Sequence, residues 1–201
     1  MLLAKNLTFY RTEKKVFENI SLSLSPKKII KLSGKNGSGK TTLLKILINI
    51  LIPSSGSIYW KGKIINKNLY DFYNNMTFIS DKTTSIRYLS VIQNIQIWKK
   101  IFISKIDLSQ IEQILNTLGL DKIQNKKVSS LSMGEIKKLE MLRLVLENKK
   151  VWLLDEPFTN LDTDSIELLK QTFQDHCYNE GSIIFSSHQM IEMRVDDEVV
   201  F

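Results

Sequence analysis

Apolar positions recur with two different spacings along this chain, and the spacing predicts where strands and helices lie. Positions 2–24 read as short strands, and 29–32 reads as a buried strand. From Thr41 onward, apolar residues recur at helical spacing until Pro53 and Gly56 end the pattern. The apolar positions of this predicted helix are Leu43, Leu44, Leu47, Ile48 and Leu51.

The middle of the chain is mainly helical. Strands are predicted over 56–65 and 76–79, and the helical spacing then dominates from about 90 to 146. One helix face is formed by Ile111, Ile114, Leu115 and Leu118, and the glycine that follows, Gly119, fits a C-terminal cap. We therefore predict a helical subdomain at roughly 85–147, inserted into the core.

The last part of the chain alternates again between strand and helix. A short apolar strand is predicted at 151–154, a helix from about Thr163, and another strand at 182–185. This alternation is typical of a parallel α/β core. The sequence thus predicts one α/β domain over 1–201, with a mixed sheet core, an N-terminal antiparallel β subdomain and the helical insertion.

Composition excludes several classes of protein. No apolar run approaches the ~18 residues that span a bilayer, and no export segment is recognisable at the first residues, so we expect a soluble chain. The single cysteine, Cys177, excludes an internal disulfide and is expected to be an inert, partly buried thiol in a reducing compartment.

The net charge is +7, which raises the question of a nucleic-acid or anionic membrane partner. However, only four of the 28 basic residues are Arg, and the lysines are scattered along the whole chain. Short runs such as Lys126-Lys127 are typical of a solvated face. We therefore expect no direct nucleic-acid binding and use the charge only as support for a peripheral location at a membrane.

A glycine-rich segment follows the predicted strand at 29–32. Its sequence, Gly34-Lys35-Asn36-Gly37-Ser38-Gly39-Lys40-Thr41, fits the phosphate-loop pattern G-x-x-x-x-G-K-[ST]. In such a loop, backbone N–H groups and the N-terminus of the next helix surround the phosphates of a nucleotide. We expect Lys40 to bind the β and γ phosphates of ATP, Thr41 to ligate Mg²⁺, and Thr42 to donate to the α phosphate.

Two adjacent acids follow the predicted strand at 151–154. Asp155 is placed to hold the metal, and Glu156 is placed to orient or deprotonate the attacking water. Four apolar residues before the acids and Pro157 after them match a Walker B strand followed by a catalytic glutamate. His188 follows the neighbouring predicted strand, from where it can reach the γ phosphate and fix Glu156 and water. His176, within the last predicted helix, is assigned no role.

Taken in this order, these motifs resemble an ATP-binding-cassette (ABC) ATPase over nearly the whole chain. Leu131-Ser132-Met133-Gly134-Glu135 is similar to the L-S-G-G-Q segment of that family, with Met133 and Glu135 as departures. The resemblance implies a head-to-tail homodimer, in which Ser132 and Gly134 contact the γ phosphate held by the partner's phosphate loop. It also implies that Phe158 to Asp162 form the D-loop, with Asp162 at the interface.

Two further sites come from the same resemblance. Tyr10 is the candidate for stacking on adenine, although Arg11 aligns nearly as well and can stack through its guanidinium plane. The family has a glutamine after the strand at 76–79 that contacts metal and water and couples to the membrane subunit. This chain has Asp81 there, an acceptor without a donor.

Within the family, the chain most resembles the haem-exporter ATPase subunits of cytochrome c biogenesis. That resemblance implies integral membrane permease subunits as partners, contact with haem only through those partners, and ATP hydrolysis that drives haem export or release to a carrier. It places the chain peripherally on the cytoplasmic face of the inner membrane, or on the matrix face of the mitochondrial inner membrane. Three alternatives remain: an ABC subunit with another substrate, a soluble ABC-type ATPase acting on nucleic acid or ribosomes, and a nucleotide-binding subunit without turnover.

Overall fold

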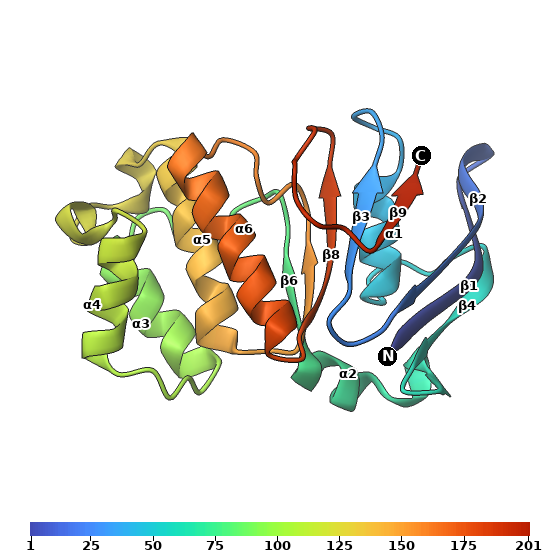
Figure 1. The fold of residues 1–201 in the computed structure, drawn as a ribbon, viewed down its shortest axis with the longest axis horizontal. Coiled ribbons are helices and arrows are strands. Elements are labelled where there is room, and N and C mark those ends of the chain that lie inside the picture. Colours follow the sequence, from blue (N-terminus) through green and yellow to red (C-terminus); the bar gives the residue numbers. More distant parts are fainter. The chain divides into compact units, whose positions relative to one another are not determined.

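Two sheets organise the first of two units in the computed structural model, which describes residues 1–201 (Figure 1). The first unit comprises Met1–Ile79, Lys149–Pro157 and Thr172–Phe201. The second unit comprises Ser80–Asn148 and Phe158–Gln171. Each unit has its own hydrophobic core, and the two are described separately.

The antiparallel sheet of the first unit consists of β1 (Leu2–Arg11), β2 (Lys14–Leu24), β4 (Ser55–Trp60) and β5 (Lys63–Ile64), in the order β2-β1-β4-β5. It matches the strands predicted over 2–24 and 56–65. Gly56 lies where β4 approaches β1. A Cβ atom at this position would lie 2.5 Å from the Asn6 carbonyl oxygen, and φ is +93°, so glycine is required there.

The parallel sheet consists of β3 (Ile29–Ser33), β6 (Met76–Ile79), β7 (Val151–Leu154), β8 (Ser182–Ser187) and β9 (Asp197–Val200), in the order β6-β7-β8-β3-β9. Every residue of β7 and β8 is buried, as is typical of inner strands of a parallel sheet. The pattern did not predict β9, because its residues are mostly exposed. Since β7, β8 and β3 are neighbours, their carboxyl ends share one edge, where open α/β sheets bind ligands.

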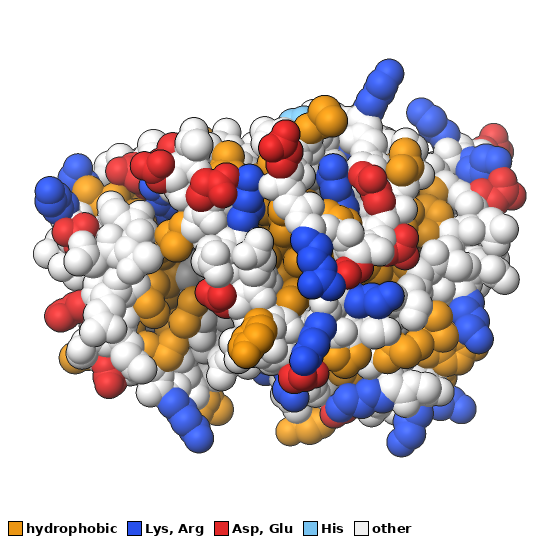
Figure 2. All heavy atoms as spheres, in the orientation of Figure 1, with side chains coloured by type: hydrophobic (Ala, Val, Ile, Leu, Met, Phe, Trp, Pro, Cys, Tyr) orange, Lys and Arg blue, Asp and Glu red, His pale blue; other side chains and the backbone are white.

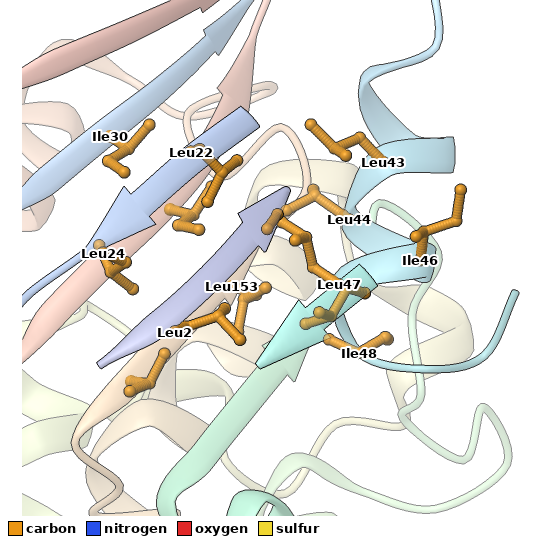
Figure 3. Packing of buried hydrophobic residues seen from close by; sticks show 14 of the residues in the cluster. Leu2, Leu22, Leu24, Ile30, Leu43, Leu44, Ile46, Leu47, Ile48 and Leu153 are labelled. Carbon is orange, nitrogen blue, oxygen red and sulfur yellow. The ribbon is translucent and has the colours of Figure 1, made fainter. Parts of the chain in front are cut away.

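Helix α1 (Lys40–Leu47) connects the two sheets through its apolar residues. In Figure 3 these residues lie against residues of β2, β3 and β7, and all belong to one buried cluster. The helix ends earlier than the predicted pattern does: Asn49 has φ +58°, and the N–H groups of Ile50 and Leu51 both donate to the Lys45 carbonyl. Leu51 still packs against the cluster, so the helical spacing of apolar positions continues beyond the helix itself. The cluster residues labelled in Figure 3 are Leu2, Leu22, Leu24, Ile30, Leu43, Leu44, Ile46, Leu47, Ile48 and Leu153.

Shorter elements complete the first unit. They are η1 (Ile65–Lys67) and α2 (Leu69–Asn75), neither of which the pattern predicted. Phe72 of α2 is fully buried and makes an edge contact with Trp60, with ring centroids 5.3 Å apart.

Cys177 is 8% exposed, and burial raises the pKa of its thiol to about 11, which agrees with the predicted inert thiol.

Helix α6 (Thr163–Tyr178) begins in the second unit and ends in the first, where it carries His176. The imidazole stacks on Trp152 with ring centroids 3.5 Å apart and an interplanar angle of 7°. A Cβ atom at Gly181 would lie 2.3 Å from His176 Nε2, so glycine at 181 leaves room for the ring. Burial lowers the pKa of His176 to about 4, although its contact with the Lys150 carbonyl opposes this shift.

This lowered pKa predicts that stability falls with acidification. His176 is neutral in the folded chain down to about pH 4 but takes up a proton near its ordinary pKa of 6.5 in the unfolded chain. The unfolded state therefore binds more protons between these values, and the free energy of unfolding decreases as pH falls through that window. Replacement of His176 by Phe keeps a ring against Trp152 and is expected to reduce the change of the free energy of unfolding with pH. Urea unfolding at several pH values measures this change. An equal change with pH in both proteins would show that His176 is not its cause.

The second unit is helical and contains the residues predicted as the inserted subdomain. Its elements are α3 (Val91–Ile101), α4 (Leu108–Thr117), η2 (Asp121–Ile123), η3 (Val128–Ser130) and α5 (Met133–Glu147). Its core is formed by Val91, Ile95, Trp98, Ile111, Leu115, Leu120, Val128, Leu139, Leu142 and Leu146. Gly119 has φ +68° just after α4, as expected for a C-terminal cap. The unit also includes Phe158–Gln171, which lies outside the predicted range.

Charged side chains are dispersed over the face of the molecule shown in Figure 2. On the face shown in Figure 2, lysines and arginines lie singly or in small groups among acidic side chains. None of the helices is both long enough and apolar enough to span a membrane.

Candidate functional site

The glycine-rich loop connects β3 to α1 in the first unit, as the sequence predicted. Gly34, Gly37 and Gly39 have φ values of +144°, +80° and +119°, a region that residues with a side chain rarely adopt. These conformations turn the backbone round on itself before α1 begins at Lys40. The hydroxyl of Ser38 is buried and has no hydrogen-bond partner within the protein, as is seen where a ligand completes a polar site.

Lys40 is held at the centre of this loop. Its side chain is buried, and Nζ donates to the carbonyl oxygens of Gly34 at 2.7 Å and Lys35 at 3.1 Å. The same Nζ lies 3.6 Å from Glu156 Oε1. The loop therefore fixes one positive charge beside its own backbone N–H groups, which is the arrangement needed to bind an anionic phosphate chain.

The residue after β7, Asp155, is joined to the loop by its carboxylate. Its Oδ1 accepts hydrogen bonds from Thr41 Oγ1 at 3.0 Å and from Ser186 Oγ at 2.6 Å. Asp155 is only 2% exposed, and its own N–H donates to the Ile79 carbonyl at 2.8 Å. Two predicted metal ligands, Thr41 and Asp155, are thus brought together although they are far apart in sequence.

Glu156 and His188 also meet at this edge. His188 Nδ1 lies 2.9 Å from Glu156 Oε2, and the Glu156 N–H donates to Ser186 Oγ at 2.9 Å. Glu156 has φ +47°, which is uncommon for a residue with a side chain and turns the chain directly after Asp155. Strained backbone of this kind concentrates at functional sites. Ser186, which joins both acids, was missed by the sequence analysis because a serine inside a buried strand gives no signal of its own.

Val16 of β2 and Phe201, which follows β9, pack behind the loop. A Cβ atom at Gly39 would lie 2.9 Å from Val16 Cγ1 and 3.4 Å from Phe201, and one at Gly34 would lie 3.0 Å from the Phe201 Cβ. The Phe201 N–H also donates to the Ser33 carbonyl at 2.9 Å. The sequence analysis predicted neither contact.

Tyr10 lies on β1 with 41% of its surface exposed, and its adenine-stacking role stays a prediction, with Arg11 as the alternative.

The L-S-G-G-Q-like segment lies in the second unit, at the start of α5. Ser132 is the N-cap residue: its Oγ accepts from the Glu135 N–H at 3.2 Å, and Glu135 Oε2 accepts from the Ser132 N–H at 2.7 Å. This is a capping box. The hydrogen bonds from Ser132 keep the pKa of Glu135 below its ordinary value. The box fixes the helix N-terminus, where N–H groups and the helix dipole favour an anion.

Gly134 in the same turn is tightly confined. A Cβ atom there would lie 2.6 Å from the carbonyl oxygen of Asn160, a residue with φ +65° in the predicted D-loop. The replacement Gly134→Ala is therefore expected to displace one of the two segments and to lower the free energy of unfolding by about 1–3 kcal/mol. Urea unfolding monitored by fluorescence measures this, with Met133→Ala as the control, because Met133 is 65% exposed in the same turn. Equal stability of the two variants would rule out the close approach.

Two other predicted residues also lie in the second unit. Asp162 binds the start of α6: Ser165 donates to it, and Lys138 Nζ lies 3.0 Å from its Oδ2. The hydrogen bonds from Ser165, together with Lys138, lower the pKa of Asp162 to about 2, so it is ionised at neutral pH. Asp81 is exposed, two residues beyond the end of β6. Its metal role stays a prediction.

Sequence comparison gives a consistent family. Residues 17–159 match the family described as "ABC transporter". The cytochrome c biogenesis ATP-binding export protein CcmA of Vibrio vulnificus (strain YJ016) is 33% identical over 189 residues, which cover 94% of this chain and 92% of that protein. The CcmA protein of Nitrosomonas europaea is 34% identical, and the match covers 96% of this chain and 91% of that protein. The CcmA protein of Reclinomonas americana is 35% identical, and the match covers 94% of this chain and 85% of that protein.

Solved structures agree with the fold. A putative ABC transporter ATP-binding protein from Pyrococcus furiosus superposes with a TM-score of 0.84 at 25% identity, covering 99% of this chain and 96% of that chain. The ATP-binding cassette MJ0796, in a dimeric structure bound to ADP and Pi, has a TM-score of 0.75 at 22% identity. That match covers 94% of this chain and 88% of the other, and it supports the fold.

Proposed function

Since this chain belongs to the ABC transporter family and is an ATPase of that type, we propose that its ATP hydrolysis drives the export of haem, or its release to a carrier, in cytochrome c biogenesis. The proposal has two parts. The chemistry of the site concerns ATP, and the names of the relatives concern haem. The two parts are tested by different experiments.

One observation supports the ATPase part of the proposal. Three groups lie together at the carboxyl ends of β3, β7 and β8: Lys40, the oxygen donors of Thr41 and Asp155, and the Glu156–His188 pair. Lys40 lies 3.6 Å from Glu156, and Thr41 lies 3.0 Å from Asp155. Phosphoryl transfer depends mainly on positioning and on charge stabilisation, and this cluster supplies both.

Each residue then has one task in hydrolysis. The loop N–H groups of residues 34–39 and Lys40 bind the β and γ phosphates, and Thr42 donates to the α phosphate. Asn36 and Ser38 belong to the same loop. Glu156 accepts a proton from the attacking water, and His188, 2.9 Å from its carboxylate, keeps Glu156 oriented toward that water.

Mg²⁺ fits the donor set of this site. The Thr41 hydroxyl and the Asp155 carboxylate are hard oxygen donors 3.0 Å apart, and such donors suit Mg²⁺ in nucleotide sites. When bound, Mg²⁺ neutralises charge on the β and γ phosphates. Asp81 is a third candidate ligand, directly or through water.

ATP is proposed to act between two copies of the chain. Ser132 and Gly134 of one protomer contact the γ phosphate held by Lys40 of its partner, because the capped start of α5 presents N–H groups to an anion. Closure on ATP and reopening after hydrolysis then move integral membrane permease subunits. The chain lies peripherally at the membrane through those subunits, on the cytoplasmic face of the inner membrane or the matrix face of the mitochondrial one.

The haem assignment is supported by relatives that are 33–35% identical and are named as cytochrome c biogenesis ATP-binding export proteins. The test is capture of the tagged chain from gently solubilised native membranes, with mass spectrometry of its partners and absorbance spectroscopy for haem. A parallel strain carrying Lys40→Ala shows which changes in c-type cytochromes, measured by haem staining, depend on ATP binding.

Recovery of haem-handling membrane subunits, together with loss of c-type cytochromes in the Lys40→Ala strain, is the expected result. Recovery of a different permease, with normal cytochromes, would keep the ATPase and reject the haem role. Capture of ribosomes or nucleic acid without membrane subunits would reject the transporter assignment altogether.

A further inference from the structure

The buried hydroxyl of Ser186, near the end of β8, contacts both acids of the candidate site. Ser186 is 0% exposed. Its Oγ donates to Asp155 Oδ1 at 2.6 Å and accepts from the Glu156 N–H at 2.9 Å. A serine hydroxyl has one proton, so the bond to Asp155 uses that proton and the bond from Glu156 uses a lone pair. One hydroxyl therefore fixes the Asp155 carboxylate relative to the backbone of Glu156.

Strand pairing on both sides holds Ser186 in place. β8 lies between β7 and β3 in the parallel sheet of the first unit. Ser186 pairs with Leu32 of β3. On the other side Phe185 pairs with Leu154, so that Ser186 lies beside Asp155 where β7 ends. The hydroxyl is thus carried by a buried inner strand, which belongs to the most rigid part of such a sheet.

The backbone of Glu156 depends on contacts of this kind. Its φ of +47° lies in the left-handed region, where a residue with a side chain stays only if the surrounding structure holds it. Ser186 binds the N–H of Glu156, and Nδ1 of His188, two residues further along the chain, lies 2.9 Å from the Glu156 carboxylate. The segment 186–188 therefore holds Glu156 at its backbone and at its side chain.

Asp155 is held by several groups at once. Besides the bond from Ser186, its Oδ1 accepts from Thr41 Oγ1 at 3.0 Å, and its N–H donates to the Ile79 carbonyl at 2.8 Å. Asp155 is 2% exposed, so water has little access to replace a lost donor. Loss of the Ser186 hydroxyl is therefore expected to change the positions of both acids together.

We propose that Ser186 is a positioning residue for ATP hydrolysis: it holds Glu156 where this residue accepts the proton of the attacking water, and it keeps Asp155 in place beside it. Ser186 acts through these two acids. The inference rests on the roles proposed above for Glu156 and Asp155. Nucleotide binding depends mainly on the loop around Lys40, so the hydrolytic step is the one that Ser186 affects.

The first test removes the hydroxyl. Ser186→Ala, in the full chain and in the complex captured from membranes, is expected to lower kcat about tenfold, since small misplacements of a reacting group have effects of at least this order. The Kd for ATP is expected to change by less than about twofold, because the groups that bind the phosphates are unaltered. Phosphate release measures kcat, and isothermal titration measures the Kd.

A matched pair of variants separates the hydroxyl from the space that it fills. Ser186→Thr and Ser186→Val both introduce a β-branched side chain, so any strain from added methyl groups is common to them. Threonine keeps the donor and the acceptor, whereas valine has neither. Ser186→Thr is therefore expected to hydrolyse ATP at least about fivefold faster than Ser186→Val.

A double-mutant cycle tests whether the effect passes through Glu156. In a chain that already carries Glu156→Gln, the proton acceptor is absent, so its exact position matters less. The tenfold effect of Ser186→Ala is expected to shrink to less than about threefold in that background. An undiminished effect there would show that Ser186 acts by another route and would overturn the inference.

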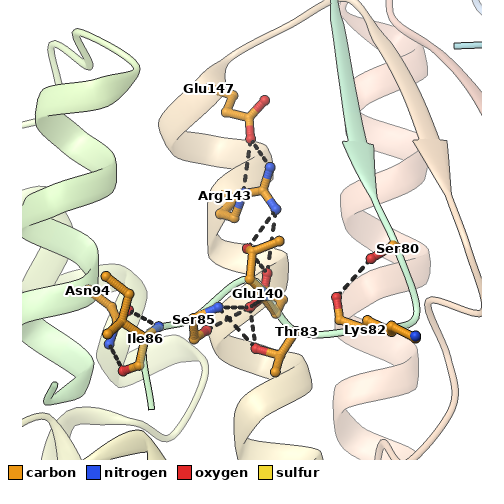
Figure 4. Close-up of polar contacts among 10 residues, drawn as sticks. Ser80, Lys82, Thr83, Ser85, Ile86, Asn94, Glu140, Arg143 and Glu147 are labelled. Atoms are coloured by element: carbon orange, nitrogen blue, oxygen red, sulfur yellow. Dashed lines mark hydrogen bonds and ion pairs between the residues drawn. The ribbon is translucent and has the colours of Figure 1, made fainter. Parts of the chain in front are cut away.

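The control for stability is Ser85→Ala in the second unit. Ser85 is also buried, and its Oγ donates to the buried carboxylate of Glu140 at 2.6 Å, in a cluster that includes Thr83 (Figure 4). Both alanine variants lose a buried hydroxyl bound to a carboxylate, so both are expected to unfold at a lower temperature. Only Ser186→Ala is expected to lower kcat. An equal fall of kcat in both variants would show that turnover follows stability, and the positioning role would be wrong.

The remaining outcomes distinguish this inference from the proposed function. Normal kcat in folded Ser186→Ala, or equal rates in Ser186→Thr and Ser186→Val, would overturn the role of Ser186 and leave that of Glu156 intact. Rapid turnover by Glu156→Gln alone would overturn both roles. If Ser186→Ala does not fold, as judged by thermal unfolding, Ser186→Cys takes its place, because a thiol is only a weak donor and acceptor. None of these results depends on which substrate the membrane complex moves.

Discussion

Replacement of Glu156 by glutamine is expected to lower ATP turnover about a thousandfold while leaving ATP binding intact. The amide cannot accept the proton of the attacking water. It keeps the size of the side chain and a hydrogen bond to His188, whose Nδ1 lies 2.9 Å from Glu156 Oε2 in the unaltered chain. Because ATP stays bound, the variant is also expected to accumulate as a closed dimer. Phosphate release measures turnover, and light scattering with MgATP measures the dimer.

The matched control is Glu167→Gln, which alters an exposed glutamate on α6 that pairs with Lys170. It is expected to hydrolyse ATP at the rate of the unaltered chain. Rapid turnover by Glu156→Gln would show that another group accepts the proton and would reject Glu156 as the catalytic base.

The second large effect is expected on affinity. Lys40→Ala removes the one buried ammonium group of the phosphate loop, and the Kd for ATP is expected to rise about a hundredfold, or roughly 2.7 kcal/mol. Isothermal titration with ATP measures the change. Lys35→Ala, in the same loop but with an exposed side chain, is expected to bind ATP nearly as the unaltered chain does.

The interpretation of Lys40→Ala depends on an intact fold. Lys40 Nζ donates to the carbonyls of Gly34 and Lys35 and faces Glu156, and Lys40 is not among the hydrophobic residues of the core cluster. Thermal unfolding without nucleotide is thus expected to change little. Unaltered ATP affinity in a folded Lys40→Ala chain would refute the assignment of the phosphate loop.

The sequence predicted which segments form the candidate site at this edge of the sheet, because their signals are local. Gly34 to Thr41 form one continuous motif, and Asp155 and Glu156 follow one apolar strand, so each could be found without knowing the strand order. Parallel pairing of β3, β7 and β8 then brings these segments together, as observed. The roles of Tyr10 and Asp81 rest on resemblance and stay predictions.

What could not be predicted depends on contacts between distant segments. Ser186 joins Asp155 to the Glu156 N–H, and Glu140 anchors Thr83–Ser85, but a buried serine or a mid-helix glutamate has no distinctive spacing. The end of α1 was misplaced for a related reason: Leu51 remains in the core after the helix has ended. The spacing of apolar residues shows which residues are buried, and buried residues can continue beyond the end of the helix that the spacing predicts.

The packing of Phe201 against Gly34 and Gly39 has a consequence for biosynthesis. The phosphate loop is translated before β8, β9 and Phe201, which pair with β3 or back the loop. Native backing of the loop must therefore wait until these later segments have left the ribosome and paired over a long sequence separation, a slow class of folding event. Because ATP stabilises the state that binds it, ATP added to a refolding chain would accumulate the completed protein and would do little for a nascent fragment.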